Sequence, residues 1–209
     1  SHYNAFFRRL TQETGVMIIK VKIGIDKNDL SPEIIEEEFK KAVTPRTKLL
    51  FFSHVASASG LVFPAKQLCR LARERNILSM VDGAHAPGMI PIDLGEIGAD
   101  FYAGNIHKWM MGPVGAAFLH ANLTNRFNLQ PLITTGSWEY PPDAADAPTD
   151  LGPDHWHYSH EYQGTQDRTP LMVLDAVLDF RSKAGETAMA KRGMELARYC
   201  RDQIAAIGL

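Results

Sequence analysis

At 209 residues the chain is long enough for one domain with a full hydrophobic core, and 45% hydrophobic and 22% charged residues are typical of a globular protein. A formal net charge of −2 without a basic stripe argues against a nucleic-acid partner. No apolar run approaches the roughly 20 residues of a membrane helix. The N-terminus lacks the pattern of a signal peptide, so we expect a cytoplasmic protein with no membrane partner.

The two cysteines, Cys69 and Cys200, are far apart and have no metal-binding spacing. We therefore expect two reduced structural thiols and no metal site built on them.

Helix and strand patterns alternate along the first part of the chain, in the order of βαβ units up to about residue 75. Ser31-Pro32 has the residue types of an N-cap and first helical position. We expect helices at 2–14, at 32–43 and from Pro64, and strands at 16–21, 48–53, 77–81, 99–103 and 115–119. The apolar face of the first helix would lie near Ala5, Phe6 and Leu10. This order predicts an α/β fold with a mainly parallel sheet and flanking helices.

The character of the sequence changes after about residue 129. Five prolines predict a long irregular loop up to residue 163. Two helices are expected after it, one at 170–183 and one from Thr187 to the end; the inward face of the first would carry Leu171, Leu174, Val177 and Leu178. The predicted organisation is a core at 1–128, a Pro-rich loop at 129–163 and helices at 164–209.

Two predicted buried strands each end in a cluster of polar residues, and both clusters lie within residues 77–113. The first strand ends in Asp82-Gly-Ala-His85 and the second in Asn105-Ile-His107-Lys108. His54 follows a third strand in the same way. Because ligands bind beyond the carboxyl ends of parallel strands, we expect these side chains to share one site.

Asp82 and Lys108 are each ambiguous alone, since an Asp after a strand is often a turn former and most lysines are solvated. Lys108 is followed by Trp109, Met110 and Met111, and apolar neighbours favour the uncharged, nucleophilic form of an amine. A lysine that tethers a cofactor covalently and a carboxylate that pairs with a ring nitrogen are the arrangement that pyridoxal phosphate requires.

The Asp82-Gly-Ala-His85 motif and the His107-Lys108 pair resemble the class V branch of the fold-type I pyridoxal-phosphate enzymes. That branch includes cysteine desulfurases, isopenicillin N epimerase-like proteins, kynureninases and C–S lyases. The segment DGAHAPG, residues 82–88, is closest in sequence to the epimerase-like group. The resemblance covers the whole chain and implies a fold-type I large domain.

The resemblance implies a role for each matching residue around pyridoxal 5′-phosphate. Lys108 would form the Schiff base and move the α-proton of an amino-acid substrate, and Asp82 would pair with the pyridinium nitrogen. His85 would lie near the phenolic oxygen of the cofactor. Asn105, where the family often has Ser, and His107 would bind the phosphate.

Two further residues bear on assembly and reaction type. Thr165 matches a residue that reaches the phosphate of the partner subunit, which implies a homodimer with shared active sites. Ser57 stands near the ring and substrate where desulfurases usually have Asn, and this difference favours epimerase-like or lyase chemistry. His54 is either a core histidine with a satisfied hydrogen bond or a group beneath the cofactor, and we favour the second.

Family members are generally much longer, with a preceding segment that contains a phosphate-binding turn and a ring-stacking aromatic residue, and a following small domain. We therefore expect a fragment of a family member that acts at the α-carbon as an epimerase, aminotransferase or C–S lyase. The alternative is a non-catalytic fold-type I remnant that serves in binding or assembly. A minor alternative is a metal-dependent hydrolase that uses His155, His157 and His160, although zinc there lacks a supporting carboxylate pattern.

Overall fold

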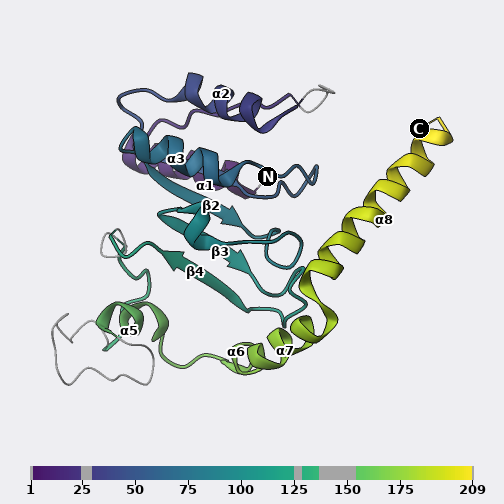
Figure 1. The fold of residues 1–209 in the computed structure, drawn as a ribbon. Helices are drawn as coiled ribbons and strands as arrows, with labels where there is room; N and C mark the ends of the chain where they lie inside the picture. Colours follow the sequence, from purple (N-terminus) through teal and green to yellow (C-terminus); the bar gives the residue numbers. More distant parts are fainter. Residues whose placement is uncertain (1, 25–29, 125–128, 137–153, 209) are drawn as a thin grey trace.

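The computed structural model describes residues 2–24, 30–124, 129–136 and 154–208, and its centre is a four-stranded sheet (Figure 1). The strand order is β1 (Leu49–Ser53), β2 (Leu78–Gly83), β3 (Phe101–Asn105) and β4 (Ala117–Ala121). The first three strands are parallel, and β4 runs antiparallel to β3. The prediction of a mainly parallel sheet with flanking helices is confirmed.

Helices α2 (Pro32–Ala42) and α3 (Ala65–Glu74) pack on one face of this sheet (Figure 1). The Ser31 hydroxyl caps α2 by accepting a hydrogen bond from the Ile34 backbone N–H, and Pro32 occupies the first turn, as predicted. Alternate strand residues face these helices and form the main core, with Ile35, Phe39, Leu50, Phe52, Leu68, Leu71, Val81 and Tyr102 among its buried members. Cys69 is a free thiol in this core, and Cys200 is free and exposed.

Helix α1 (His2–Thr14) lies on the opposite face of the sheet, where it contacts β1. The rings of Tyr3 and Phe7 lie 5.2 and 5.6 Å from the ring of Phe51, which alternates with the core residues of β1. Phe6, by contrast, is 58% exposed. The predicted apolar face of α1 is therefore wrong at Ala5 and Phe6, which are exposed, whereas Leu10 is half-buried. The helix contacts β1 through residues 3 and 7.

Residues 16–21 form no strand, contrary to the prediction. The run is rich in β-branched residues, but a strand needs a partner, and none of the four strands in the described residues pairs with it. Val16, Met17 and Ile19 are each about half exposed or more. The segment is extended backbone that follows α1 and leads towards α2.

The stretch predicted as an irregular loop contains helix α5 (His155–Glu161). Its N-cap is Asp154, whose carboxylate accepts a hydrogen bond from the His157 backbone N–H at 3.1 Å. This cap starts a helix immediately after the last proline of the stretch, so the prediction of irregular structure is wrong for residues 155–161. Most of the remaining stretch, residues 137–153, lies outside the described residues.

The predicted helix at 170–183 is divided into α6 (Thr169–Met172) and α7 (Leu174–Ala184), with a break at Val173. The predicted inward face is confirmed only in part, because Leu174 and Val177 are half-buried but Leu171 and Leu178 are 48% and 51% exposed. The buried side chain of α7 is instead Arg181.

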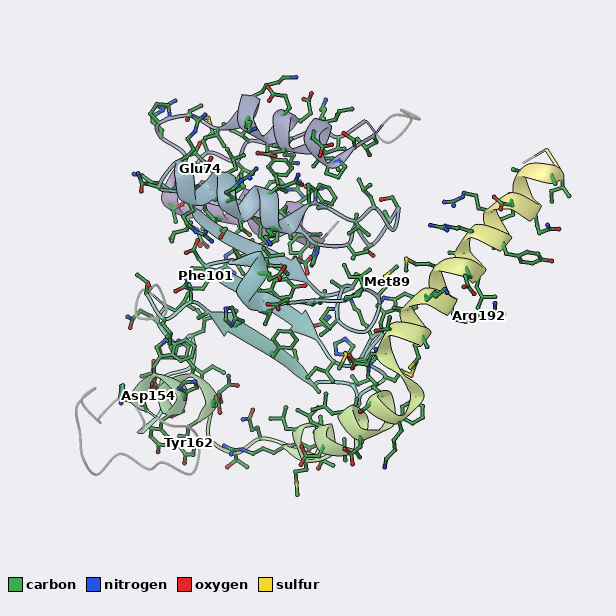
Figure 2. All side chains as sticks on the ribbon, in the orientation of Figure 1. Glu74, Met89, Phe101, Asp154, Tyr162 and Arg192 are labelled. Carbon is green, nitrogen blue, oxygen red and sulfur yellow. The ribbon has the colours of Figure 1, made fainter. Side chains whose placement is uncertain are left out.

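Helix α8 (Glu186–Ala206) extends away from the sheet, and its side chains, including Arg192, project outward (Figures 1 and 2). The short helix α4 (Leu94–Ile97) connects β2 to β3. Among the helices described, none combines the length and the apolar character needed to cross a membrane.

Candidate active site

The turns after β2 and β3 lie at the same edge of the sheet, because the two strands are parallel neighbours (Figure 1). Asp82 lies near the end of β2, opposite Ser53 of β1 and Ala103 of β3. Strand alternation directs its side chain to the face that α1 covers, away from the main core. The parallel register therefore brings the two polar clusters to the same edge of the sheet, as predicted.

The carboxylate of Asp82 accepts hydrogen bonds from three donors. Tyr3 Oη and Ser53 Oγ donate to Oδ2 at 2.8 and 3.0 Å, and the Ala84 backbone N–H donates to Oδ1 at 2.9 Å. A carboxylate has about four acceptor positions, so the described residues leave one on Oδ1 for a further donor. Burial, and then the hydrogen bond to Asp82, raise the pKa of Tyr3 to about 12, so this hydroxyl remains a donor near neutral pH.

The side chains of His85, Lys108 and Trp109 form a hydrogen-bonded group across the two turns. Lys108 Nζ lies 3.0 Å from His85 Nε2, and Trp109 Nε1 lies 3.4 Å from His85 Nδ1. An indole N–H can only donate, so His85 Nδ1 must be the acceptor, and the proton of the neutral imidazole is then on Nε2. The His85 imidazole thus lies between the Trp109 indole and the Lys108 amine.

The electrostatic setting favours the neutral imidazole that this group requires. Burial first, and then the neighbouring Lys108 when it is charged, lower the pKa of His85, while Asp82 opposes them. His85 thus lies within electrostatic reach of both the amine and the carboxylate.

The turn that carries Lys108 is closed by its own backbone. The Met111 N–H donates to Lys108 O at 3.0 Å, and the Gly112 N–H donates to Ile106 O at 2.9 Å. Met111 has φ 64°, a left-handed conformation that is uncommon outside glycine. Trp109 and Met111 are 49% and 57% exposed, so the expectation that they surround the amine with buried apolar groups is wrong. The structure instead gives the amine a polar contact with His85 Nε2.

Asn105 and His107 lie on the same approach to this turn. Asn105 is the last residue of β3 and shares a face of the sheet with Asp82 through the strand alternation. His107 Nδ1 lies 3.3 Å from Ala116 O, so it donates and leaves Nε2 as the free ring acceptor in the neutral form. Both are half-buried, and their roles in binding a phosphate remain predictions.

His54, Ser57 and Thr165 lie outside the hydrogen-bonded cluster at Asp82 and Lys108. His54 is buried and pairs through Nδ1 with Tyr102 Oη at 2.9 Å, while its backbone N–H donates to Asp82 O. It thus has the satisfied hydrogen bond of a core histidine and also supports the Asp82 backbone. Ser57 is exposed in the turn after β1, and Thr165 is exposed between α5 and α6.

Three residues of the site escaped the sequence reasoning. Tyr3 and Ser53 bind Asp82 from other segments, and Trp109 was counted only as an apolar neighbour although its indole N–H holds His85. Ser53 could have been recognised as the residue at the end of the strand beside Asp82. The contact of Tyr3 spans 79 positions, and no local sequence signal predicts it.

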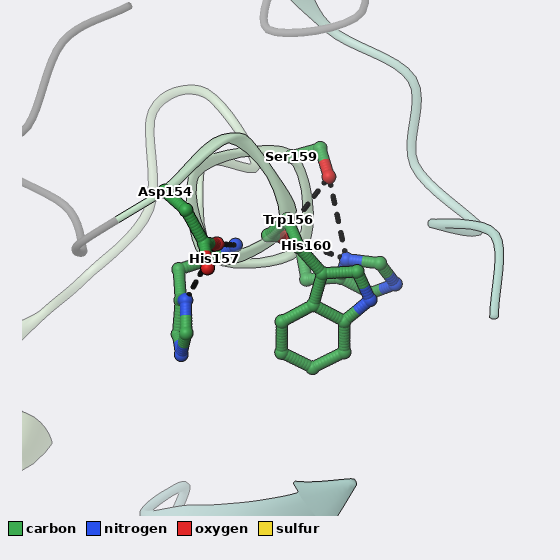
Figure 3. Close-up of polar contacts among 5 residues, drawn as sticks. All are labelled: Asp154, Trp156, His157, Ser159 and His160. Carbon is green, nitrogen blue, oxygen red and sulfur yellow. Dashed lines mark hydrogen bonds and ion pairs between the residues drawn. The ribbon is translucent and has the colours of Figure 1, made fainter. Parts of the chain in front are cut away.

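The three histidines of α5 do not form a shared metal site among the described residues. Figure 3 shows the contacts of His157 and His160. His157 Nδ1 lies 2.8 Å from the Asp154 carboxylate, whereas His160 Nδ1 donates to Trp156 O at 2.8 Å and stacks on the Trp156 ring. Across the ranges that the structure describes, no three His, Cys, Asp or Glu residues come together in a way that could hold a metal ion. The hydrolase alternative therefore has no structural support here.

The residues present fit pyridoxal phosphate in the chemistry of their donors and acceptors. Asp82 has an acceptor position left for a ring N–H, and Lys108 provides a primary amine of the kind that condenses with an aldehyde. His85 provides an N–H between them.

Comparison with known proteins agrees with this geometry. The family model described as aminotransferase class-V matches residues 3–209. Isopenicillin N epimerase of Amycolatopsis lactamdurans is 35% identical over 202 residues, which are 95% of this chain and 50% of that protein. The chain spans about half the length of the curated relatives it matches.

Two solved structures illustrate the fold. The cysteine desulfurase CsdA of Escherichia coli has a TM-score of 0.76 at 20% identity, covering 95% of this chain and 47% of that one. A C-DES variant with glycine covalently linked to its PLP cofactor has a TM-score of 0.74 at 19% identity, covering 90% and 48%. Both share the fold-type I architecture. The chain belongs to the aminotransferase class-V family, whose enzymes depend on pyridoxal phosphate.

Proposed function

We propose that this chain forms the cofactor-binding part of a pyridoxal-phosphate-dependent enzyme that acts at the α-carbon of an amino acid, with Lys108 as its catalytic lysine. The observation that carries the proposal is the 3.0 Å contact of Lys108 Nζ with His85 Nε2, while the Trp109 indole N–H donates to the other ring nitrogen of His85. Membership of the family supports the same assignment.

Each residue of the site has a distinct task in this proposal. Bound pyridoxal phosphate would supply the electron-withdrawing ring that acidifies the substrate α-carbon. Lys108 Nζ would hold the cofactor covalently and carry the proton removed from or returned to the α-carbon. Asp82 would accept the ring N–H and keep it protonated, and His85 Nε2–H would donate to the phenolic oxygen.

Asn105 and His107 would bind the phosphate from the end of β3. The place of Asn105 on the face of Asp82 and the half-buried position of His107 two residues later support this role. Thr165 is exposed, as expected of a residue that reaches a partner's phosphate, and we propose a homodimer with shared sites in the cytoplasm.

For the reaction type we favour epimerisation or a C–S lyase reaction over desulfuration. The relative named isopenicillin N epimerase and the serine at position 57 support this choice. Racemisation, transamination and β-elimination all begin with removal of the α-proton, so Lys108 serves each of them.

A spectroscopic titration tests the proposal. Adding pyridoxal phosphate to the chain should produce a visible absorption band that saturates, and Lys108→Ala should abolish it. Lys191→Ala is the matched control, because Lys191 is an exposed lysine on α8, and this variant should titrate like the parent.

The same titration addresses the non-catalytic remnant, which remains the alternative because the chain spans half the length of its relatives. A remnant that has lost cofactor binding would give no saturable band. Equal bands in the parent and Lys108→Ala would show binding through other lysines and would refute the role of Lys108.

A further inference from the structure

Arg181 is the most deeply buried charged residue of the C-terminal helices. Its side chain is 2% exposed, although neighbouring residues of α7 such as Leu178 and Phe180 are 51% and 55% exposed. Burying a guanidinium is costly unless its donors are satisfied, so a buried arginine on an otherwise open helix requires specific partners.

The partners of Arg181 are the two turns of the candidate active site. Nη1 donates to Trp109 O at 2.9 Å, Nη2 donates to Gly88 O at 3.3 Å, and Nε pairs with Glu186 Oε1 at 3.4 Å. One planar fork therefore joins the turn after β2 to the turn after β3, and Glu186 at the start of α8 orients it.

The two turns that Arg181 joins are already in close backbone contact. Gly88 has φ 80°, and a Cβ at this position would overlap the Trp109 carbonyl. The carbonyl groups of Gly88 and Trp109 cannot hydrogen-bond to each other, because a carbonyl oxygen only accepts. The guanidinium supplies both donors.

The carbonyl that Arg181 holds belongs to the residue directly after Lys108. The carbonyls of Ile106 and Lys108 are fixed within the turn, and Arg181 fixes that of Trp109. Rotation of the Trp109 peptide would move both the backbone of Lys108 and the indole that sets the His85 tautomer. Loss of the Arg181 hydrogen bond would therefore change the position of the Lys108 amine and its contact with His85.

We propose that Arg181 is a positioning residue that locks the Lys108 turn through the Trp109 carbonyl and so couples α7 and α8 to the reactive amine. The inference rests on the proposed function in treating Lys108 as the reactive group. Its test uses no cofactor, so the two can fail separately.

The test measures how fast an amine-directed acylating reagent modifies Lys108 as a function of pH, with other lysines of the chain as internal references. Arg181→Met keeps the volume of the side chain and removes its donors. We expect labelling of Lys108 near neutral pH to slow by about two- to tenfold, as for the loss of one hydrogen bond. Amide hydrogen exchange should quicken at residues 106–112.

Two further variants separate positioning from folding. Arg192→Met is the matched control, because Arg192 on α8 is 67% exposed and pairs only with its own helix at Glu195 in the described contacts; it should match the parent. Arg181→Lys retains the buried charge and can reach one carbonyl, so it should restore part of the labelling rate. If Arg181→Met is too unstable to study, Arg181→Lys alone decides.

An unchanged Lys108 labelling profile and unchanged exchange at 106–112, in either folded Arg181 variant, would overturn the proposal. A changed profile in a chain that binds no pyridoxal phosphate would leave the positioning role intact and refute the proposed function instead.

Discussion

Replacing Trp109 by Phe removes the one group that fixes the tautomer of His85 while keeping an aromatic ring in place. In the parent chain the indole N–H occupies His85 Nδ1, so the proton of the neutral imidazole lies on Nε2. Without that N–H, His85 can also carry its proton on Nδ1 and accept a hydrogen bond from Lys108 at Nε2. The variant should therefore populate both tautomers of His85.

The size of the effect follows from the geometry of the lost hydrogen bond. A typical hydrogen bond contributes about 0.5–1.5 kcal/mol net, and a 3.4 Å contact from a half-exposed indole belongs at the lower end. About 0.5 kcal/mol corresponds to about a twofold change in the ratio of the two His85 tautomers, since 1.4 kcal/mol is tenfold.

Nitrogen NMR of the imidazole is the most specific assay, because protonated and unprotonated ring nitrogens have distinct chemical shifts. The parent should show an unprotonated Nδ1 and a protonated Nε2 at His85 above its pKa, and Trp109→Phe should show a mixture. Trp156→Phe is the control, since this indole stacks on His160 of α5 instead. A parent His85 protonated on Nδ1 would refute the reasoning, as would an identical pair of shifts in the variant.

Three other perturbations test neighbouring parts of the account. Asp82→Asn removes the negative charge but keeps a similar shape, so cofactor affinity should fall and the visible band should change while thermal unfolding stays close to the parent; unchanged binding would contradict the assigned role. Gly83→Ala places a Cβ against the buried ring of Tyr102, and urea unfolding should show a loss of roughly 1–3 kcal/mol, whereas a neutral result would mean that the ring moves freely. Burial lowers the pKa of His54, so below the unfolded value of about 6.5 the unfolded chain takes up this proton first. Stability should be complete above that pH and fall as the pH drops towards the folded pKa; unfolding free energies of His54→Gln should lack this part of the slope, and parallel curves would exclude His54 as its source.

The central strands and the polar residues that end them could be predicted from sequence because their signals are local. Continuous apolar runs mark β1 to β3, and the parallel register then places Asp82 and the Lys108 turn at one edge. The run at 16–21 has the same local signal but no partner strand among the described residues, and propensity alone does not make a strand.

The features missed from sequence depend on contacts between distant segments. Arg181 was overlooked because arginine is normally exposed, and its burial follows from carbonyls 72 and 93 positions away. Tyr3 of α1 reaches Asp82 on the face of the sheet that α1 covers. The sequence predicted apolar neighbours for Lys108, whereas the structure gives its amine a polar contact with His85.

The central claim is that Lys108 is the lysine that carries pyridoxal phosphate. Its most direct test is to incubate the chain with the cofactor, reduce with borohydride and map the modified peptides by mass spectrometry. The account predicts a pyridoxyl group on the peptide containing Lys108 at a stoichiometry near one per chain, with surface lysines such as Lys191 unmodified. Label scattered over surface lysines, or none on Lys108, would contradict it.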